Sequence, residues 1–342
     1  MSTDVGRRPH PSGGAAEGSD PVPAPRAVAA PRWAVVPVVA NLVAQVGIVV
    51  TGGAVRLTGS GLGCPTWPQC TEGSYTPVYS PEMGLHDDIE FGNRLLTFAV
   101  ALASLAALAA VARLVVTGRR EANLLPWAVA PLVGVVLQAV IGGITVHLSL
   151  HPVTVATHFL VSMALVAVST VLLVRVRERA DGPAGLVVAT APRRVAQACG
   201  VLLGAVLVLG TLVTGAGPHS GDAEQPARLG FDTAVVSRVH ADAVVLLVVA
   251  LLVLLVAQHR TGAPARAQRR AVTLLAVVLA QGVVGWVQYA TDLPVLLVAL
   301  HMLGAGLLVI ATTVLLMSQR RRSPLPLPPA PRSPVEHSPQ QA

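Results

Sequence analysis

Eight long apolar stretches constrain this chain more than any other feature of its sequence. Each is long enough to cross a bilayer as a helix, which takes roughly 20 residues. Only 12% of the residues are charged, against about 25% in soluble domains. Because the apolar runs are continuous rather than alternating, and because backbone groups in lipid must be bonded internally, we predict an all-α integral membrane protein. The predicted spans are residues 33–55, 88–116, 124–146, 152–175, 195–215, 233–257, 271–290 and 294–317.

The basic side chains are all arginines, and they gather in alternate connections between the spans. The remaining connections carry most of the acidic residues. By the positive-inside rule, both termini are predicted to be cytoplasmic, in a multi-pass protein of the cell (plasma) membrane. This topology accounts for the net charge of +7, so a nucleic-acid partner is not implied. Residues 1–31 and 321–342, which are rich in small residues and proline, are predicted to be disordered cytoplasmic tails.

The two halves of the sequence repeat one another. Gln138 precedes His158 by twenty residues, and Gln281 precedes His301 by the same twenty. Each half begins on the same side of the membrane and holds an even number of spans, so the repeats are parallel. We therefore predict two pseudo-symmetric four-helix bundles, formed by residues 32–180 and 190–320.

Three histidines, His158, His240 and His301, lie inside apolar spans, where an ionisable side chain is costly and usually functional. His240 and His301 fall at similar depth and suit two-imidazole ligation of a b-type haem. In the first half, His158 matches His301, but Asn93 stands opposite His240. We predict a closed haem site in the second half and a haem site with one imidazole in the first. The alternative for each histidine is a hydrogen bond between helices.

Charged side chains surround the predicted first-half site. Glu90 lies three residues before Asn93, hence on the same helix face, and is a candidate proton donor or acceptor. Its alternative role is an interfacial charge paired with Arg94. Arginines at the outer helix ends are candidates for binding haem propionates, with pairing to the acidic loops as the alternative; they are Arg56, Arg94 and Arg238.

Two cysteines, Cys64 and Cys70, lie in the first outer loop. The outside of the membrane is the oxidising side, so a disulfide or a redox-active pair is expected there. A structural staple and a redox-active pair are both compatible with this position.

Several of these motifs resemble one known family. The stretch G-G-A-V-R-L-T-G-S-G-L-G-C-P-T-W-P-Q-C, then I-E-F-G-N-R-L-L and Q-A-V-I-G-G-I-T-V-H, together with the histidines of the fourth and eighth spans, resemble haem A synthases, the Cox15/CtaA family. The resemblance covers residues 33–317. It implies an eight-helix, pseudo-two-fold fold and oxidation of the C8 methyl of haem O to the formyl of haem A by successive hydroxylations, for assembly of aa3-type cytochrome oxidase. Implied partners are haem O synthase, oxidase-assembly factors, membrane lipid and an electron donor or acceptor.

The resemblance also assigns roles to residues. It implies that His240 and His301 are the axial ligands of a haem b cofactor and that the substrate haem O binds at His158 and Asn93. It maps the family's important glutamate to Glu90, and the family's loop pair to Cys64 and Cys70. This chain departs from the family pattern at Asn93, where many members have histidine.

Two other function classes are compatible with parts of the sequence. A di-haem b-type electron carrier, such as a quinol-linked cytochrome b, would need two closed sites with two histidines each, and Asn93 argues against this. A transporter would have broken helices at mid-membrane, whereas the candidate residues here gather toward the outer face.

Overall fold

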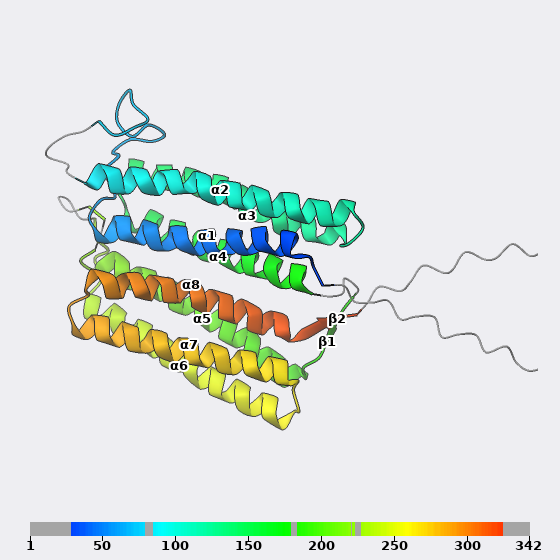
Figure 1. Ribbon diagram of the computed structural model, residues 1–342. Coiled ribbons are helices and arrows are strands. Elements are labelled where there is room, and N and C mark those ends of the chain that lie inside the picture. Colours follow the sequence, from blue (N-terminus) through cyan, green and yellow to red (C-terminus); the bar gives the residue numbers. More distant parts are fainter. Residues whose placement is uncertain (1–28, 79–84, 179–182, 220, 223–226, 324–342) are drawn as a thin grey trace, which may run out of the picture.

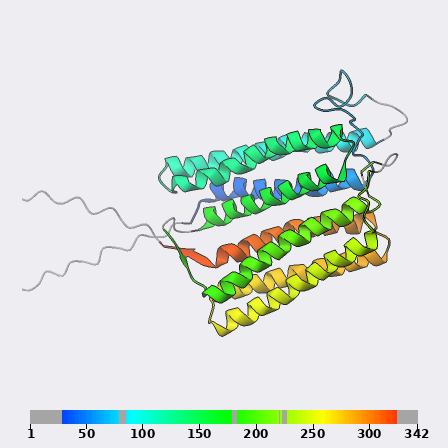
Figure 2. The same ribbon diagram turned by 180° about the vertical axis from the view of Figure 1, so that it is seen from behind.

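The computed structural model describes residues 29–78, 85–178, 183–219, 221–222 and 227–323. Within these ranges, eight helices are long and apolar enough to cross a membrane, which confirms the predicted all-α fold with eight spans. The helices run side by side along a common direction (Figures 1 and 2). Their bounds are α1 (Arg32–Leu57), α2 (His86–Val116), α3 (Leu125–His147), α4 (Pro152–Arg177), α5 (Thr190–Ala216), α6 (Thr233–Arg260), α7 (Ala265–Ala290) and α8 (Val295–Ser318), with a 3-10 turn η1 (Ala122–Leu124) before α3.

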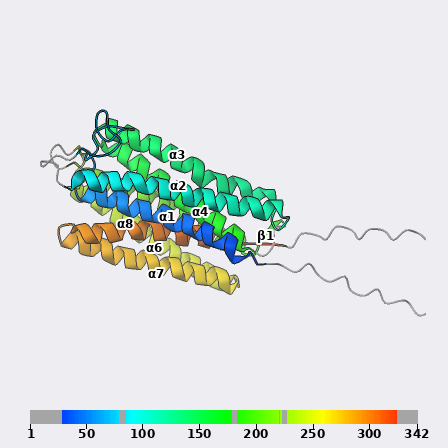
Figure 3. The ribbon, with the colours of Figure 1, turned by 45° about the horizontal axis from the view of Figure 1, so that its top comes forward.

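The two ends of the helix array differ. The chain enters α1 and leaves α8 at one end, here called the termini end, and the loop between α1 and α2 lies at the opposite end, here called the disulfide end (Figures 1 and 3). At the termini end, β1 (Ala184–Leu186) pairs antiparallel with β2 (Arg320–Arg322). This strand pair was not predicted, and the predicted boundary of the second tail falls inside it. Residues 1–28 and 324–342 of the predicted tails lie outside the described residues.

Local sequence explains where several helices begin. Pro152 occupies the first position of α4, where its missing N–H group costs nothing. Asp232 caps α6 by accepting hydrogen bonds from two first-turn N–H groups at 2.8 and 3.1 Å. Helices α5 and α7 begin at Thr190 and Ala265, earlier than the predicted residues 195 and 271. Their additional first turns carry arginines. The predicted spans were bounded by apolar residues, so these turns were left out although their backbone is helical.

The helices of each half contact one another in the same order. In the first half, α1 packs on α2, α2 on α3, α3 on α4 and α4 on α1, and the second half repeats this with α5 to α8. The halves meet where α1 and α4 pack on α8, and α4 on α5. One buried apolar cluster crosses this boundary, since it joins Val49 and Val166 to Leu203 and Leu308. The halves therefore share a core, and their pseudo-symmetric division into two bundles stays a prediction.

Candidate functional site

The four predicted ligand positions lie at matched depth near the disulfide end. Asn93 and His240 are each seven residues past the first residue of α2 and α6, and His158 and His301 are each six residues past the first residue of α4 and α8. At about 1.5 Å per residue, each lies roughly 10 Å along its helix. All four side chains are partly buried.

A glycine on the preceding helix faces each of these four side chains. A methyl group placed on the glycine would lie 3.0–3.4 Å from Cε1 of the histidine, or 3.7 Å from Nδ2 of Asn93. A larger side chain there would displace the ring or the helix. These glycines were not predicted from the sequence, although two of them follow the repeated glutamines by four residues. The pairs are Gly52 with Asn93, Gly142 with His158, Gly210 with His240, and Gly285 with His301.

The repeated glutamines bind the backbone of the histidine helices rather than the imidazoles. Nε2 of Gln138 donates to the carbonyl of His158 at 2.9 Å, and Nε2 of Gln281 donates to the carbonyl of His301 at 2.6 Å. Gln138 also bonds the hydroxyl of Ser162. These bonds cross between α3 and α4 and between α7 and α8, as polar side chains between membrane helices commonly do. The twenty-residue spacing therefore sets the register of each helix pair at the histidine.

The three imidazoles have hydrogen-bonding capacity that the described residues leave unused. Nδ1 of His158, His240 and His301 is buried without a hydrogen bond; the His240 ring also approaches the carbonyl of Val206, without good bond geometry. Unpaired buried polar atoms are rare in native structures and usually have a functional reason. Neutral imidazoles of this kind fit the axial ligands of a haem iron.

Asn93 is held by a neighbour that the second half lacks. The hydroxyl of Thr51 donates to Oδ1 of Asn93 at 2.8 Å, and Gly52 faces its amide nitrogen. In α5, the residue before the matching Gly210 is Leu209, which cannot form such a bond. The first half therefore pairs threonine with asparagine where the second half has leucine and histidine.

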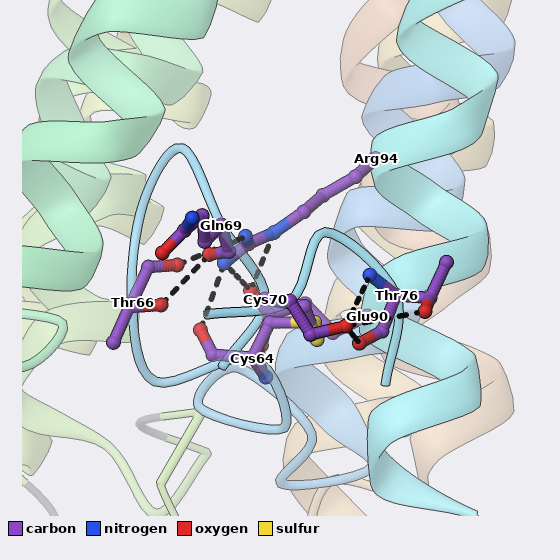
Figure 4. The surroundings of a disulfide bond; sticks show 8 residues. Cys64, Thr66, Gln69, Cys70, Thr76, Glu90 and Arg94 are labelled. Atoms are coloured by element: carbon purple, nitrogen blue, oxygen red, sulfur yellow. Dashed lines mark hydrogen bonds and ion pairs between the residues drawn. A yellow bond between two sulfur atoms is a disulfide. The ribbon is translucent and has the colours of Figure 1, made fainter. Parts of the chain in front are cut away.

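Glu90 and Arg94 bind the loop that contains the two cysteines (Figure 4). Cys64 and Cys70 form a disulfide, which confirms the predicted bond. Oε2 of Glu90 accepts the N–H of Cys64 at 2.8 Å, and Oε1 accepts from Nε and Nη2 of Arg94 at 3.1 and 2.6 Å. The same guanidinium donates to the carbonyls of Cys64 at 2.8 Å, Thr66 at 3.0 Å and Gln69 at 3.1 Å.

These bonds use the full capacity of the guanidinium. Arginine has five N–H groups, and Arg94 makes two bonds to Glu90 and three to loop carbonyls. A propionate could bind Arg94 only by replacing one of these partners. Glu90 is 6% exposed, and its contacts match the alternative of local pairing with Arg94. A role for Glu90 in proton transfer stays a prediction.

The other two predicted propionate arginines differ in setting. Arg56, at the end of α1, donates from Nε to the carbonyl of His219 at 2.6 Å and from Nη2 to that of Thr214 at 2.9 Å. Both acceptors belong to the second half, so Arg56 forms hydrogen bonds between the two halves. Within the described residues, Arg56 has no carboxylate partner and retains unused N–H groups. Arg238 is exposed on α6.

Comparison with known proteins points to one family. No curated protein sequence matches this chain. The family model COX15-CtaA, described as cytochrome oxidase assembly protein, matches residues 33–84, 87–220 and 233–339. The match includes the four positions at matched depth and all eight helices, except the first residue of α1 and of α2. The chain therefore belongs to the COX15-CtaA family of cytochrome oxidase assembly proteins.

Proposed function

We propose that this protein is a haem A synthase, which oxidises the C8 methyl of haem O to the formyl of haem A. The observation that carries the proposal is the asymmetry between the two halves. His240 and His301 offer two imidazoles at matched depth, whereas His158 has Asn93 at the corresponding position. A resident cofactor suits the first arrangement, and a substrate that must leave suits the second. Membership of an oxidase-assembly family supports this assignment.

The second half would hold haem b through His240 and His301. When bound there, haem b would supply one-electron transfer. The chain prepares this site in two ways. Gly210 and Gly285 leave room for the two rings against the neighbouring helices, and Gln281 fixes the backbone of His301. The chain thus provides space for both rings and fixes the backbone of one of them.

The first half would hold the substrate haem O through His158. Thr51 engages the amide oxygen of Asn93, so Asn93 offers no strong second ligand, and a singly held haem exchanges more readily. Each of two hydroxylations inserts one oxygen atom into a C–H bond and oxidises the methyl carbon by two electrons, and the resulting hydrated aldehyde loses water to give the formyl group. If O2 supplies the oxygen atom, an external donor provides two electrons and two protons per step and the second oxygen atom leaves as water; if water supplies it, an external acceptor takes the two electrons. Glu90, a buried carboxylate paired with the partly buried Arg94, is the proposed proton donor or acceptor.

Charge supports the remaining assignments. Arg56 is a partly buried cation whose described partners are carbonyls, which makes it the strongest candidate to bind a haem propionate; Arg238 and Arg94 are weaker candidates.

The excess of arginine at the termini end supports a plasma-membrane protein with cytoplasmic termini. Haem O synthase and oxidase-assembly factors are the proposed partners.

The test is production of haem A in a host that lacks it. The full chain is co-expressed with a haem O synthase, and extracted haems are separated and identified by mass spectrometry. We expect haem A with the wild-type chain. His240→Ala and His301→Ala should each lose the haem b that co-purifies with the protein, because each removes one of two axial ligands. His259→Ala, at the termini end of α6, is the matched control and should retain haem b.

Other outcomes would contradict the proposal. Absence of haem A despite a supply of haem O would exclude haem A synthase activity. Two haems that both fail to bind carbon monoxide would instead indicate a di-haem electron carrier, since carbon monoxide needs an open iron position.

A further inference from the structure

The side chain of Trp67 is seated in a gap that a glycine leaves on α3. A methyl group placed on Gly143 would overlap the indole ring. The carbonyl of Trp67 accepts a hydrogen bond from Nε2 of His147 at 3.1 Å. Gly142, the preceding residue, faces the imidazole of His158. Trp67 therefore contacts α3 at the depth of the glycine that accommodates the first-half histidine, on the adjacent face of the helix, because consecutive helical residues are rotated by about 100°.

The loop that presents Trp67 is held on its other side by α2. Arg94 binds the carbonyl of Thr66, which precedes Trp67, and the carbonyl of Gln69, which follows two residues later. The disulfide closes the segment from Cys64 to Cys70. Figure 4 shows the loop lying beside α2, with the guanidinium reaching into it. The loop thus spans from α2 to α3 at the disulfide end of the first half.

The second half has a different residue at the position that corresponds to Gly143. Gly143 lies five residues after Gln138, and the residue five after Gln281 is Trp286. The side chain of Trp286 is 72% exposed. The half proposed to bind substrate therefore has glycine on α3 where the other half has tryptophan on α7. In the first half, the loop residue Trp67 supplies the aromatic ring at this position instead.

We propose that Trp67 is a positioning residue that covers the first-half site from the disulfide end and holds the substrate haem in place. The proposal rests on the proposed function and deepens it. A flat porphyrin and an indole ring offer favourable aromatic contact, and a cover excludes water from the reacting carbon. Because two hydroxylations act on one carbon, the alcohol formed first must stay bound until the second. A cover that slows its release favours the complete product.

The experiment compares four variants of the full chain co-expressed with haem O synthase. Two of them, Trp67→Ala and Gly143→Leu, remove the ring or its seat, and Trp67→Phe keeps an aromatic ring. Trp286→Ala is the matched control from the repeat. Two quantities are measured: haem O retained per chain after purification, and the ratio of the hydroxymethyl haem to haem A. Haem b content and thiol labelling report whether the second half and the disulfide are intact.

We expect Trp67→Ala and Gly143→Leu to lower haem O retention several-fold and to raise the ratio of alcohol to haem A. Trp67→Phe should bring haem O retention and the ratio of alcohol to haem A most of the way back to wild-type values. Trp286→Ala should match the wild type in both quantities. Wild-type retention and ratio in Trp67→Ala would overturn the proposal. If Trp67→Ala also loses the disulfide, the proposal is tested with Trp67→Leu. The proposed cover requires an aromatic ring, so wild-type retention and ratio in Trp67→Leu would contradict the proposal.

Failure of the proposed function gives a different result. A wild-type chain that makes no haem A refutes haem A synthase activity. Retention of haem O by that chain, and its loss in Gly143→Leu, would still support a cover over a haem site.

Discussion

Arg94 directs all five of its N–H groups to Glu90 and the loop, and this limits what either residue does alone. Charge-assisted hydrogen bonds are about twice as strong as neutral ones, and loss of Arg94 would leave the buried Glu90 carboxylate without its cation. The pair therefore orders the disulfide loop whether or not Glu90 also transfers a proton. The two roles separate because ordering needs both partners, while proton transfer needs the carboxyl alone.

Substitutions at Glu90 and Arg94 should distinguish these roles. We expect Glu90→Ala and Arg94→Ala to release the loop alike, so that Cys64 and Cys70 are labelled faster by a thiol reagent after mild reduction. In Glu90→Gln one amide oxygen can accept from Cys64 or from Arg94 but cannot replace both carboxylate oxygens, so labelling should be intermediate between wild type and Glu90→Ala. Proton transfer by Glu90 predicts that this variant accumulates haem O or the hydroxylated intermediate.

Asp88→Asn, an exposed change in the same turn of α2, is the control for both measurements. Normal haem A formation by Glu90→Gln would exclude a proton-transfer role and leave Glu90 as an anchor of the loop.

At the scale of elements, α1 and α8 pack closely at two glycines, one on each helix. A methyl group on Gly53 would overlap the sulfur of Met302, and one on Gly306 would lie 3.5 Å from Val46. Gly53 follows the glycine that faces Asn93, and Met302 follows His301. The contact between these helices therefore links the first-half site to the second, and a change on α1 should reach His301, the proposed haem b ligand on α8.

Filling the gap at Gly53 should weaken the second-half site. Gly53→Leu forces Met302 and α8 away from α1, and overpacking of this kind costs about 1–3 kcal/mol. We expect a lower thermal unfolding temperature and less haem b per chain. Adding Met302→Ala to the same chain restores space and should recover part of both. Gly47→Leu is the control, because nothing lies within 4 Å of a methyl group there; an equal loss in that variant would show a general effect of bulk on α1.

At the scale of the whole molecule, hydropathy alone predicts the eight helices, because lipid leaves the backbone few alternatives to helix. The parts that depend on contacts between elements could not be predicted. The bond from Thr51 to Asn93 and the seat of Trp67 on Gly143 require the distance between helices and the path of a loop. The twenty-residue spacing located His158 and His301, but it did not reveal that the glutamines bind backbone carbonyls. The candidate ligand positions could be located because they lie on helices, whereas the contact between the loop and α3 could not.

Orientation in the membrane is a property of the whole chain, and two matched threonines can test it. Thr261 and Thr291 are the exposed C-caps of α6 and α7, and each hydroxyl bonds a carbonyl four residues earlier at 2.8 Å. They lie at opposite ends of α7, Thr261 at the termini end. In a Cys199→Ala background, a membrane-impermeant maleimide should label Thr291→Cys in intact spheroplasts and Thr261→Cys only after permeabilisation. This follows because arginine-rich ends are retained in the cytoplasm and the disulfide needs the oxidising side. The reverse labelling pattern would place both termini outside and contradict the proposed topology.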